Sequence, residues 1–83
     1  MKILIVDDSE PVGARLVALL RRVEGLEFLP QVFSATRAFQ AFQEHRPGVV
    51  LLDLLLKGGT SLELLRNIKA TAPTTRVVCE SKR

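Results

Sequence analysis

Two short apolar runs that each end in aspartate constrain the fold of this chain more than any other feature. The first runs from Lys2 to Val6 and is followed by Asp7 and Asp8, and the second, Val49 to Leu52, is followed by Asp53. Continuous apolar runs rich in β-branched residues are typical of parallel strands that are covered on both faces. Because the carboxyl ends of parallel strands lie at the same edge of a sheet, we expect the three carboxylates to meet there.

The segment after the first run has the spacing of an amphipathic helix. Ser9 can cap this helix, and Pro11 falls in its first turn, where the missing N–H costs nothing. Apolar residues then recur at helical spacing at Val12, Leu16, Leu19, Leu20 and Val23. Gly25 supplies a left-handed stop, so we predict a helix from about Glu10 to Glu24.

Two further helices are predicted from capping signals. Ser34 or Thr36 can cap the second, which carries Ala38, Phe39, Ala41 and Phe42 and ends before Pro47, because a residue that precedes proline avoids the helical region. Thr60 followed by Glu63 forms a capping-box pattern, so the third helix extends to about Ala70 and carries Leu62, Leu65 and Ile68.

Two more strands complete the pattern. The segment 26–33 is a strand interrupted by Pro30, and a proline cannot donate to a ladder, so this strand is expected at a sheet edge. A fourth strand begins at Arg76 and includes Cys79. The order β-α-β-α-β-α-β predicts an α/β fold with a parallel sheet and right-handed crossovers.

A cluster of three carboxylates is suited to particular kinds of chemistry. Carboxylates packed together repel one another, so they must hold a proton or bind a cation, and an all-oxygen cluster suits Mg²⁺. A carboxylate can also act as the nucleophile that accepts a phosphoryl group. Any one aspartate could simply end a strand or cap a helix. The combination of Asp7, Asp8 and Asp53 with the Gly58-Gly59 turn favours a phosphoryl-transfer site.

The composition of the chain limits the classes of protein to which it can belong. The chain has 83 residues, 47% of them apolar and 25% charged, which predicts one small globular domain that occupies residues 1–83. The net charge of +3 is spread along the chain and is only weak evidence for nucleic-acid binding. Cys79 is the only cysteine and is interpreted as a small buried strand residue, and the single His45 as a solvent-side residue near a helix end. The apolar runs are too short to span a bilayer and no signal peptide is evident, so we expect a cytoplasmic protein.

The segments 3–9 and 49–54, followed by Lys57-Gly58-Gly59-Thr60, resemble the two main signatures of response-regulator receiver domains. The resemblance covers nearly the whole chain. It implies a flavodoxin-like fold with strand order 2-1-3-4 for the strands present. It also implies that Asp53 is phosphorylated by a sensor histidine kinase or a small phosphodonor. Asp7 and Asp8 would then hold Mg²⁺, and the Leu55 carbonyl would add a backbone ligand.

The resemblance is incomplete at the end of the chain. Receivers contain five βα units, whereas this sequence ends in or just after its fourth strand, so we expect a truncated receiver. The lysine that receivers carry at the end of strand five has no counterpart here. Ser81 is the candidate for the hydroxyl residue that ends strand four, although the polar segment 80–83 is equally consistent with a frayed tail.

Three functional hypotheses follow. The first is a phosphoryl-accepting receiver, and the second is a phosphorylation-independent interaction or dimerisation module. An exposed strand-four edge predicts self-association, through edge pairing or exchange of elements between protomers. The third, a Mg²⁺-dependent phosphatase, is disfavoured because position 55 is leucine and not a second acid, so we do not expect an enzyme. Direct DNA binding is not expected either, because no residues remain for a helix-turn-helix.

Overall fold

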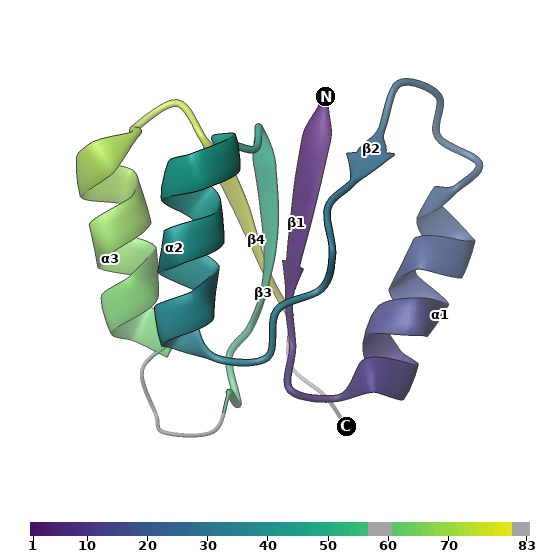
Figure 1. The fold of residues 1–83 in the computed structure, drawn as a ribbon, viewed down its shortest axis with the longest axis horizontal. Helices are drawn as coiled ribbons and strands as arrows, with labels where there is room; N and C mark the ends of the chain where they lie inside the picture. Colours follow the sequence, from purple (N-terminus) through teal and green to yellow (C-terminus); the bar gives the residue numbers. More distant parts are fainter. Residues whose placement is uncertain (57–60, 81–83) are drawn as a thin grey trace.

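The computed structural model describes residues 1–56 and 61–80, in which helices alternate with parallel strands (Figure 1). The elements are β1 (Lys2–Val6), α1 (Glu10–Leu20), β2 (Glu27–Phe28), α2 (Ala35–His45), β3 (Val49–Asp53), α3 (Ser61–Thr71) and β4 (Arg76–Glu80). The strands form one parallel sheet in the order β2-β1-β3-β4. This confirms the predicted α/β class, the flavodoxin-like strand order and the edge position of the strand that precedes Pro30.

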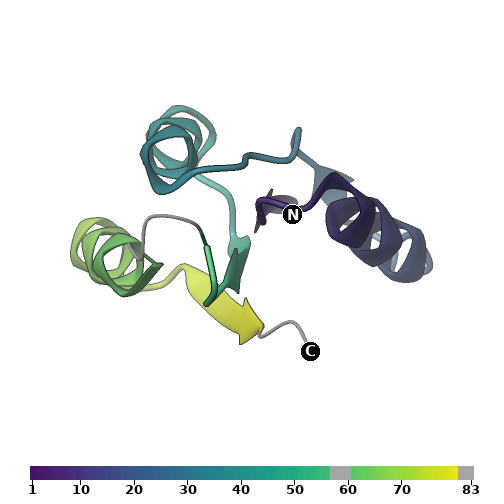
Figure 2. The same ribbon diagram turned by 90° about the horizontal axis from the view of Figure 1, so that it is seen from below.

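Helices cover the sheet unequally on its two faces. Helices α2 and α3 lie side by side on one face, and α1 lies on the other, toward the β2 edge (Figures 1 and 2). The prediction of helices on both faces is therefore confirmed. No helix in the described ranges has the length and apolar character needed to cross a membrane.

The hydrophobic core lies between the sheet and the pair α2 and α3. Its buried members come from β1, β3, both of these helices and the loops that flank them: Leu4, Val6, Leu29, Ala38, Phe42, Val50, Leu52, Leu56, Leu64 and Ile68. Alternate residues of β1 and β3 contribute to this core because successive side chains of a strand point to opposite faces. The chain therefore builds its main packing on one face of the sheet.

Helix α2 begins and ends as its sequence predicts. The Ser34 side chain accepts a hydrogen bond from the Arg37 backbone N–H at 3.3 Å, so Ser34 and not Thr36 is the cap. The helix ends at His45, and Arg46 adopts a left-handed conformation with φ of 48° immediately before Pro47. His45 is half-buried at the helix end, with its Nε2 atom 3.5 Å from a Glu44 carboxylate oxygen.

Helix α1 is shorter than predicted. Ser9 caps it, but the helix ends at Leu20 and not at Glu24. The Val23 N–H bonds the Leu20 carbonyl at 3.0 Å, an i to i+3 bond that tightens the last turn and takes Val23 out of the helical stripe. Gly25 does adopt a positive φ of 86°, in the turn that follows.

Two further sequence predictions need correction at the sheet edges. The predicted strand 26–33 pairs over Glu27–Phe28 only, with one isolated bridge from Val32 to Val6. Cys79 lies in β4 as expected, but it is exposed and not buried. The prediction of burial rested on residue type alone, whereas in the described residues β4 is the last strand of the sheet. The predicted Thr60 cap lies outside the described residues.

Candidate functional site

The three predicted aspartates meet at the carboxyl edge of the two central strands. Asp53 is the last residue of β3, and Asp7 and Asp8 follow the last residue of β1. The two strands are neighbours in the sheet, with Val6 paired to Leu52, so both strands end at the same level. The sequence therefore predicted the grouping correctly, since two buried parallel strands in register must bring their carboxyl ends together.

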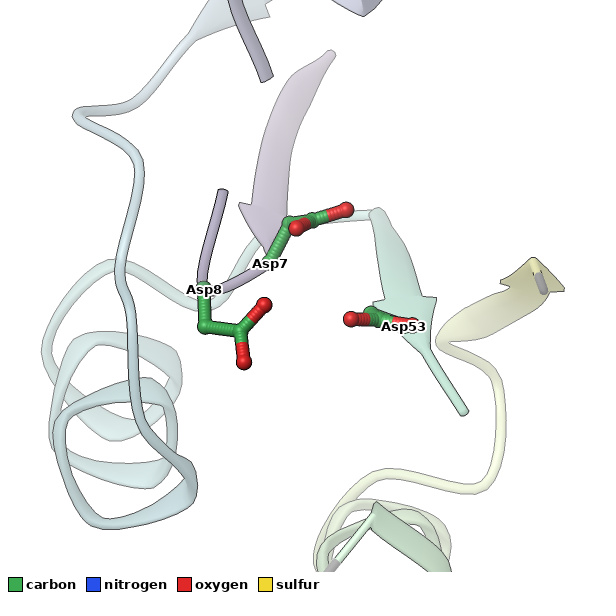
Figure 3. Close-up of side chains that lie close together, drawn as sticks. All are labelled: Asp7, Asp8 and Asp53. Atoms are coloured by element: carbon green, nitrogen blue, oxygen red, sulfur yellow. The ribbon is translucent and has the colours of Figure 1, made fainter. Parts of the chain in front are cut away.

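The acidic cluster is compact and largely withdrawn from solvent. One carboxylate oxygen from each of Asp7, Asp8 and Asp53 lies within 4.8 Å of the other two. Asp7 and Asp53 have no exposed surface, and Asp8 is half-buried. Figure 3 shows the three side chains converging from the ends of β1 and β3 on the same space.

Local hydrogen bonds fix the orientation of two of these carboxylates. The Ser9 N–H donates to Asp7 Oδ1 at 2.8 Å, and the Leu55 N–H donates to Asp53 Oδ1 at 2.9 Å. Each is the short turn in which an aspartate bonds the backbone two residues further on. The same device thus terminates both strands and holds each side chain in one direction.

Two residues that the sequence did not identify support the cluster. The buried Ser61 hydroxyl donates to the Asp53 carbonyl oxygen at 2.7 Å, which ties the start of α3 to the end of β3. The Gln31 side-chain amide donates to the carbonyl oxygens of Asp7 at 2.8 Å and Ser9 at 3.0 Å. A hydroxyl at a helix start was a detectable signal for Ser61. Gln31 carries no sequence signal, because its role depends on where the loop after β2 passes.

The donor set fits a hard divalent cation. Three carboxylates that each offer an oxygen to one small space match the all-oxygen ligation of Mg²⁺, which takes a few carboxylates and keeps several waters. The cluster would hold its negative charge at a lower cost with such an ion than without it. Leu55 has a 60% exposed side chain and an N–H bonded to Asp53, and the role of its carbonyl as a ligand stays a prediction. Ser81 lies outside the described residues.

The fold and site together define a class. This is an open parallel α/β protein with an acidic, cation-compatible site at the carboxyl ends of its central strands. The family "Response regulator receiver domain" matches residues 3–83. The chain belongs to this receiver family of two-component signalling.

Curated relatives and solved structures agree with this assignment. The chain is 31% identical over 78 residues to the response regulator GacA of Pseudomonas syringae pv. syringae. It is 36% identical over 80 residues to a protein-glutamate methylesterase/protein-glutamine glutaminase of Cereibacter sphaeroides. It superposes with a TM-score of 0.89 and 26% identity on a LuxR-family response regulator from Aurantimonas sp., covering 99% of this chain. The response regulator domain of Thermotoga maritima CheB gives a TM-score of 0.86 and 25% identity, with 98% of this chain covered.

The matched region is only a part of each of these proteins. The chain spans 36% of the length of the GacA relative and 22% of the methylesterase relative. It spans 59% of the Aurantimonas chain and 60% of the Thermotoga domain. The comparisons therefore identify the receiver domain and not the activity of a whole protein.

Proposed function

We propose that this receiver accepts a phosphoryl group on Asp53, with Mg²⁺ held by Asp7 and Asp8 and the Leu55 carbonyl as a further ligand. The compact cluster of three carboxylates is the observation that carries the proposal, since one oxygen from each lies within 4.8 Å of the others. The phosphoryl donor would be a sensor histidine kinase or a small phosphodonor. The site would work in the cytoplasm, where such donors are found.

The reaction assigns different roles to the three acids. A carboxylate oxygen of Asp53 attacks phosphorus, a mixed anhydride forms, and the bond from phosphorus to the donor breaks with its electron pair leaving on the donor. Asp7 and Asp8 reach the cluster from the end of the neighbouring strand β1 (Figure 3). When bound, Mg²⁺ would offset the negative charge of the carboxylates and phosphoryl oxygens.

Intact-mass measurement tests this proposal directly. The protein is incubated with Mg²⁺ and acetyl phosphate as the small phosphodonor, and the wild type is expected to gain the mass of one phosphoryl group. Asp53→Asn should gain nothing, and Glu63→Gln, a matched change at an exposed carboxylate of α3, should behave as the wild type. A wild-type chain that is folded by circular dichroism but gains no mass would contradict the proposal.

A second function is favoured by the open edge of β4. In the described residues β4 pairs with β3 alone, and Val78 at its centre is 51% exposed. An unpaired strand edge that carries exposed apolar side chains is a template for pairing with another chain. We infer that a second copy of this chain is the partner, which would make the module a homodimer independent of phosphorylation.

The sequence of β4 is complementary to itself in the antiparallel direction. With Val78 opposite Val78 about a two-fold axis, Arg76 of one copy faces Glu80 of the other at both ends of the strand pair. Opposite charges directly across an antiparallel pair contribute roughly 0.2–1 kcal/mol, and like charges there would be destabilising. A parallel pairing in the same register would instead bring equal charges together, so antiparallel pairing is favoured.

Disulfide trapping tests this register. In a Cys79→Ser background, Val78→Cys is expected to form a disulfide dimer quickly, because directly opposed residues of antiparallel strands bring their Cβ atoms to about 5 Å. Leu19→Cys in the same background is the control, since Leu19 is 65% exposed on α1. Equal cross-linking of the two variants, together with a monomer by light scattering at micromolar concentration, would overturn the dimer.

A further inference from the structure

We propose that Gln31 is a positioning residue for the cation site, and that Gly13 is a glycine because the Gln31 amide occupies the space of a side chain there. The inference rests on the proposed Mg²⁺ site and deepens it. The Gln31 amide donates to the backbone carbonyls of Asp7 and Ser9, so it acts on the backbone that carries Asp7 and Asp8.

The Gln31 amide braces the backbone on both sides of Asp8. An amide nitrogen has two protons, and both are used, one on the carbonyl of Asp7 and one on the carbonyl of Ser9. The Ser9 carbonyl also accepts from the Gly13 N–H at 3.1 Å, the first bond of α1. The residue between the two braced carbonyls is Asp8, so its backbone position is set by one side chain from another part of the chain.

The brace is anchored to the sheet. Gln31 lies in the connection after β2, and its neighbour Val32 runs beside β1. The Val32 N–H bonds the Ile5 carbonyl at 3.0 Å, and the Val32 carbonyl accepts from the Asp7 N–H at 3.1 Å. The Gln31 side chain therefore fixes the loop after β1 relative to the buried strand β1 itself.

Gly13 makes room for this amide. A Cβ atom added at Gly13 would lie 1.7 Å from Gln31 Oε1 and 2.2 Å from its Cδ. Non-bonded atoms do not come this close, so the amide would have to move. Glycine inside a helix lowers its stability relative to alanine. Gly13 does not have a positive φ, so its backbone conformation does not require glycine. Contact with Gln31 is the physical reason for glycine at this position.

The loop needs such a brace because α1 packs weakly. Gly13 is the only fully buried residue of α1. Leu19 on the same helix is 65% exposed. Asp8 is also the least buried acid of the cluster. Groups that orient metal ligands from behind typically change metal affinity about 10- to 100-fold when they are removed.

Mg²⁺ titration by calorimetry on the full chain tests the brace. Gln31→Ala is expected to weaken Mg²⁺ binding about 10-fold, since Asp8 is no longer held. Gly13→Ala should weaken it similarly by displacing the amide. In the double variant the new methyl group enters the space that Gln31 has vacated, so the second change should add no further loss. Gln40→Ala, on the exposed side of α2, is the matched control and should bind as the wild type.

The results of these titrations distinguish a failure of the Gln31 proposal from a failure of the proposed Mg²⁺ site. A folded wild type that binds no Mg²⁺ at millimolar concentration would refute the cation site itself. Wild-type binding with unchanged affinity in Gln31→Ala would overturn the brace alone, as would losses that add up in the double variant. Thermal unfolding without Mg²⁺ gives the folded fraction of each variant, and an affinity loss that only follows this fraction would also overturn the positioning role.

Discussion

The two faces of the sheet are built differently. On the face of α2 and α3, Phe42, Leu64 and Ile68 are almost completely buried against the strands. On the face of α1, the helix fully buries Gly13 alone, and Leu19 and Val78 stay exposed. The difference separates two tasks. One face supplies most of the apolar burial that stabilises the fold, and the other carries the loop of the acid pair, whose backbone also accepts hydrogen bonds from the Gln31 side chain.

The largest expected effect falls on the packed face. Phe42→Ala removes a fully buried ring that lies 6.2 Å from Phe39 between centroids and beneath the Arg46 guanidinium. Truncation of a buried aromatic costs about 3–5 kcal/mol, a large share of the stability of a small domain. Urea unfolding followed by circular dichroism measures it. A loss below about 1 kcal/mol would mean that the two faces do not differ as described.

Ser61→Ala probes the junction between the packed face and the site. It removes the buried hydroxyl that donates to the Asp53 carbonyl at 2.7 Å, and a buried acceptor that loses its partner costs about 1–3 kcal/mol. The same urea titration measures the loss. Leu62→Ala, at an exposed neighbour in α3, is the control. Equal stability in the two variants would show that this bond does not hold α3 to β3.

Ser34→Ala tests a helix start on the packed face. The Ser34 side chain accepts from the Arg37 N–H, and removal of such a cap costs typically about 1 kcal/mol. Ser34→Asp keeps an acceptor and should retain most of the stability. Thermal unfolding of both variants measures the effect, and a Thr36→Ala change that was more damaging than Ser34→Ala would reverse the assignment of the cap.

The sequence predicted the packed face and the cluster well for a physical reason. Strands buried on both faces have continuous apolar runs, and the register of parallel neighbours brings Asp7 and Asp53 together without any long-range information. Capping signals such as Ser34 act over three residues, so they too can be read locally.

The weakly packed regions were predicted less well because their state depends on what covers them. The apolar stripe of α1 predicted a helix to Glu24, yet without strong packing the last turn tightens after Leu20. Cys79 has the residue type of a buried strand position, but its exposure is set by the place of β4 in the sheet. Gln31 was missed because its two bonds join segments more than 20 residues apart.

The smallest expected effect falls on α1. Leu19→Ala truncates a leucine that is 65% exposed, so it should change stability by less than about 0.5 kcal/mol, as surface substitutions away from special features do. Leu64→Ala makes the same chemical change at a buried position of α3, where about 2–5 kcal/mol is expected. Urea titrations of this matched pair measure the asymmetry of the two faces with the residue type held constant. Two nearly equal losses would mean that α1 is packed in solution against something that covers Leu19, and the hydrogen-bonded brace would then not be the main restraint on the acid pair.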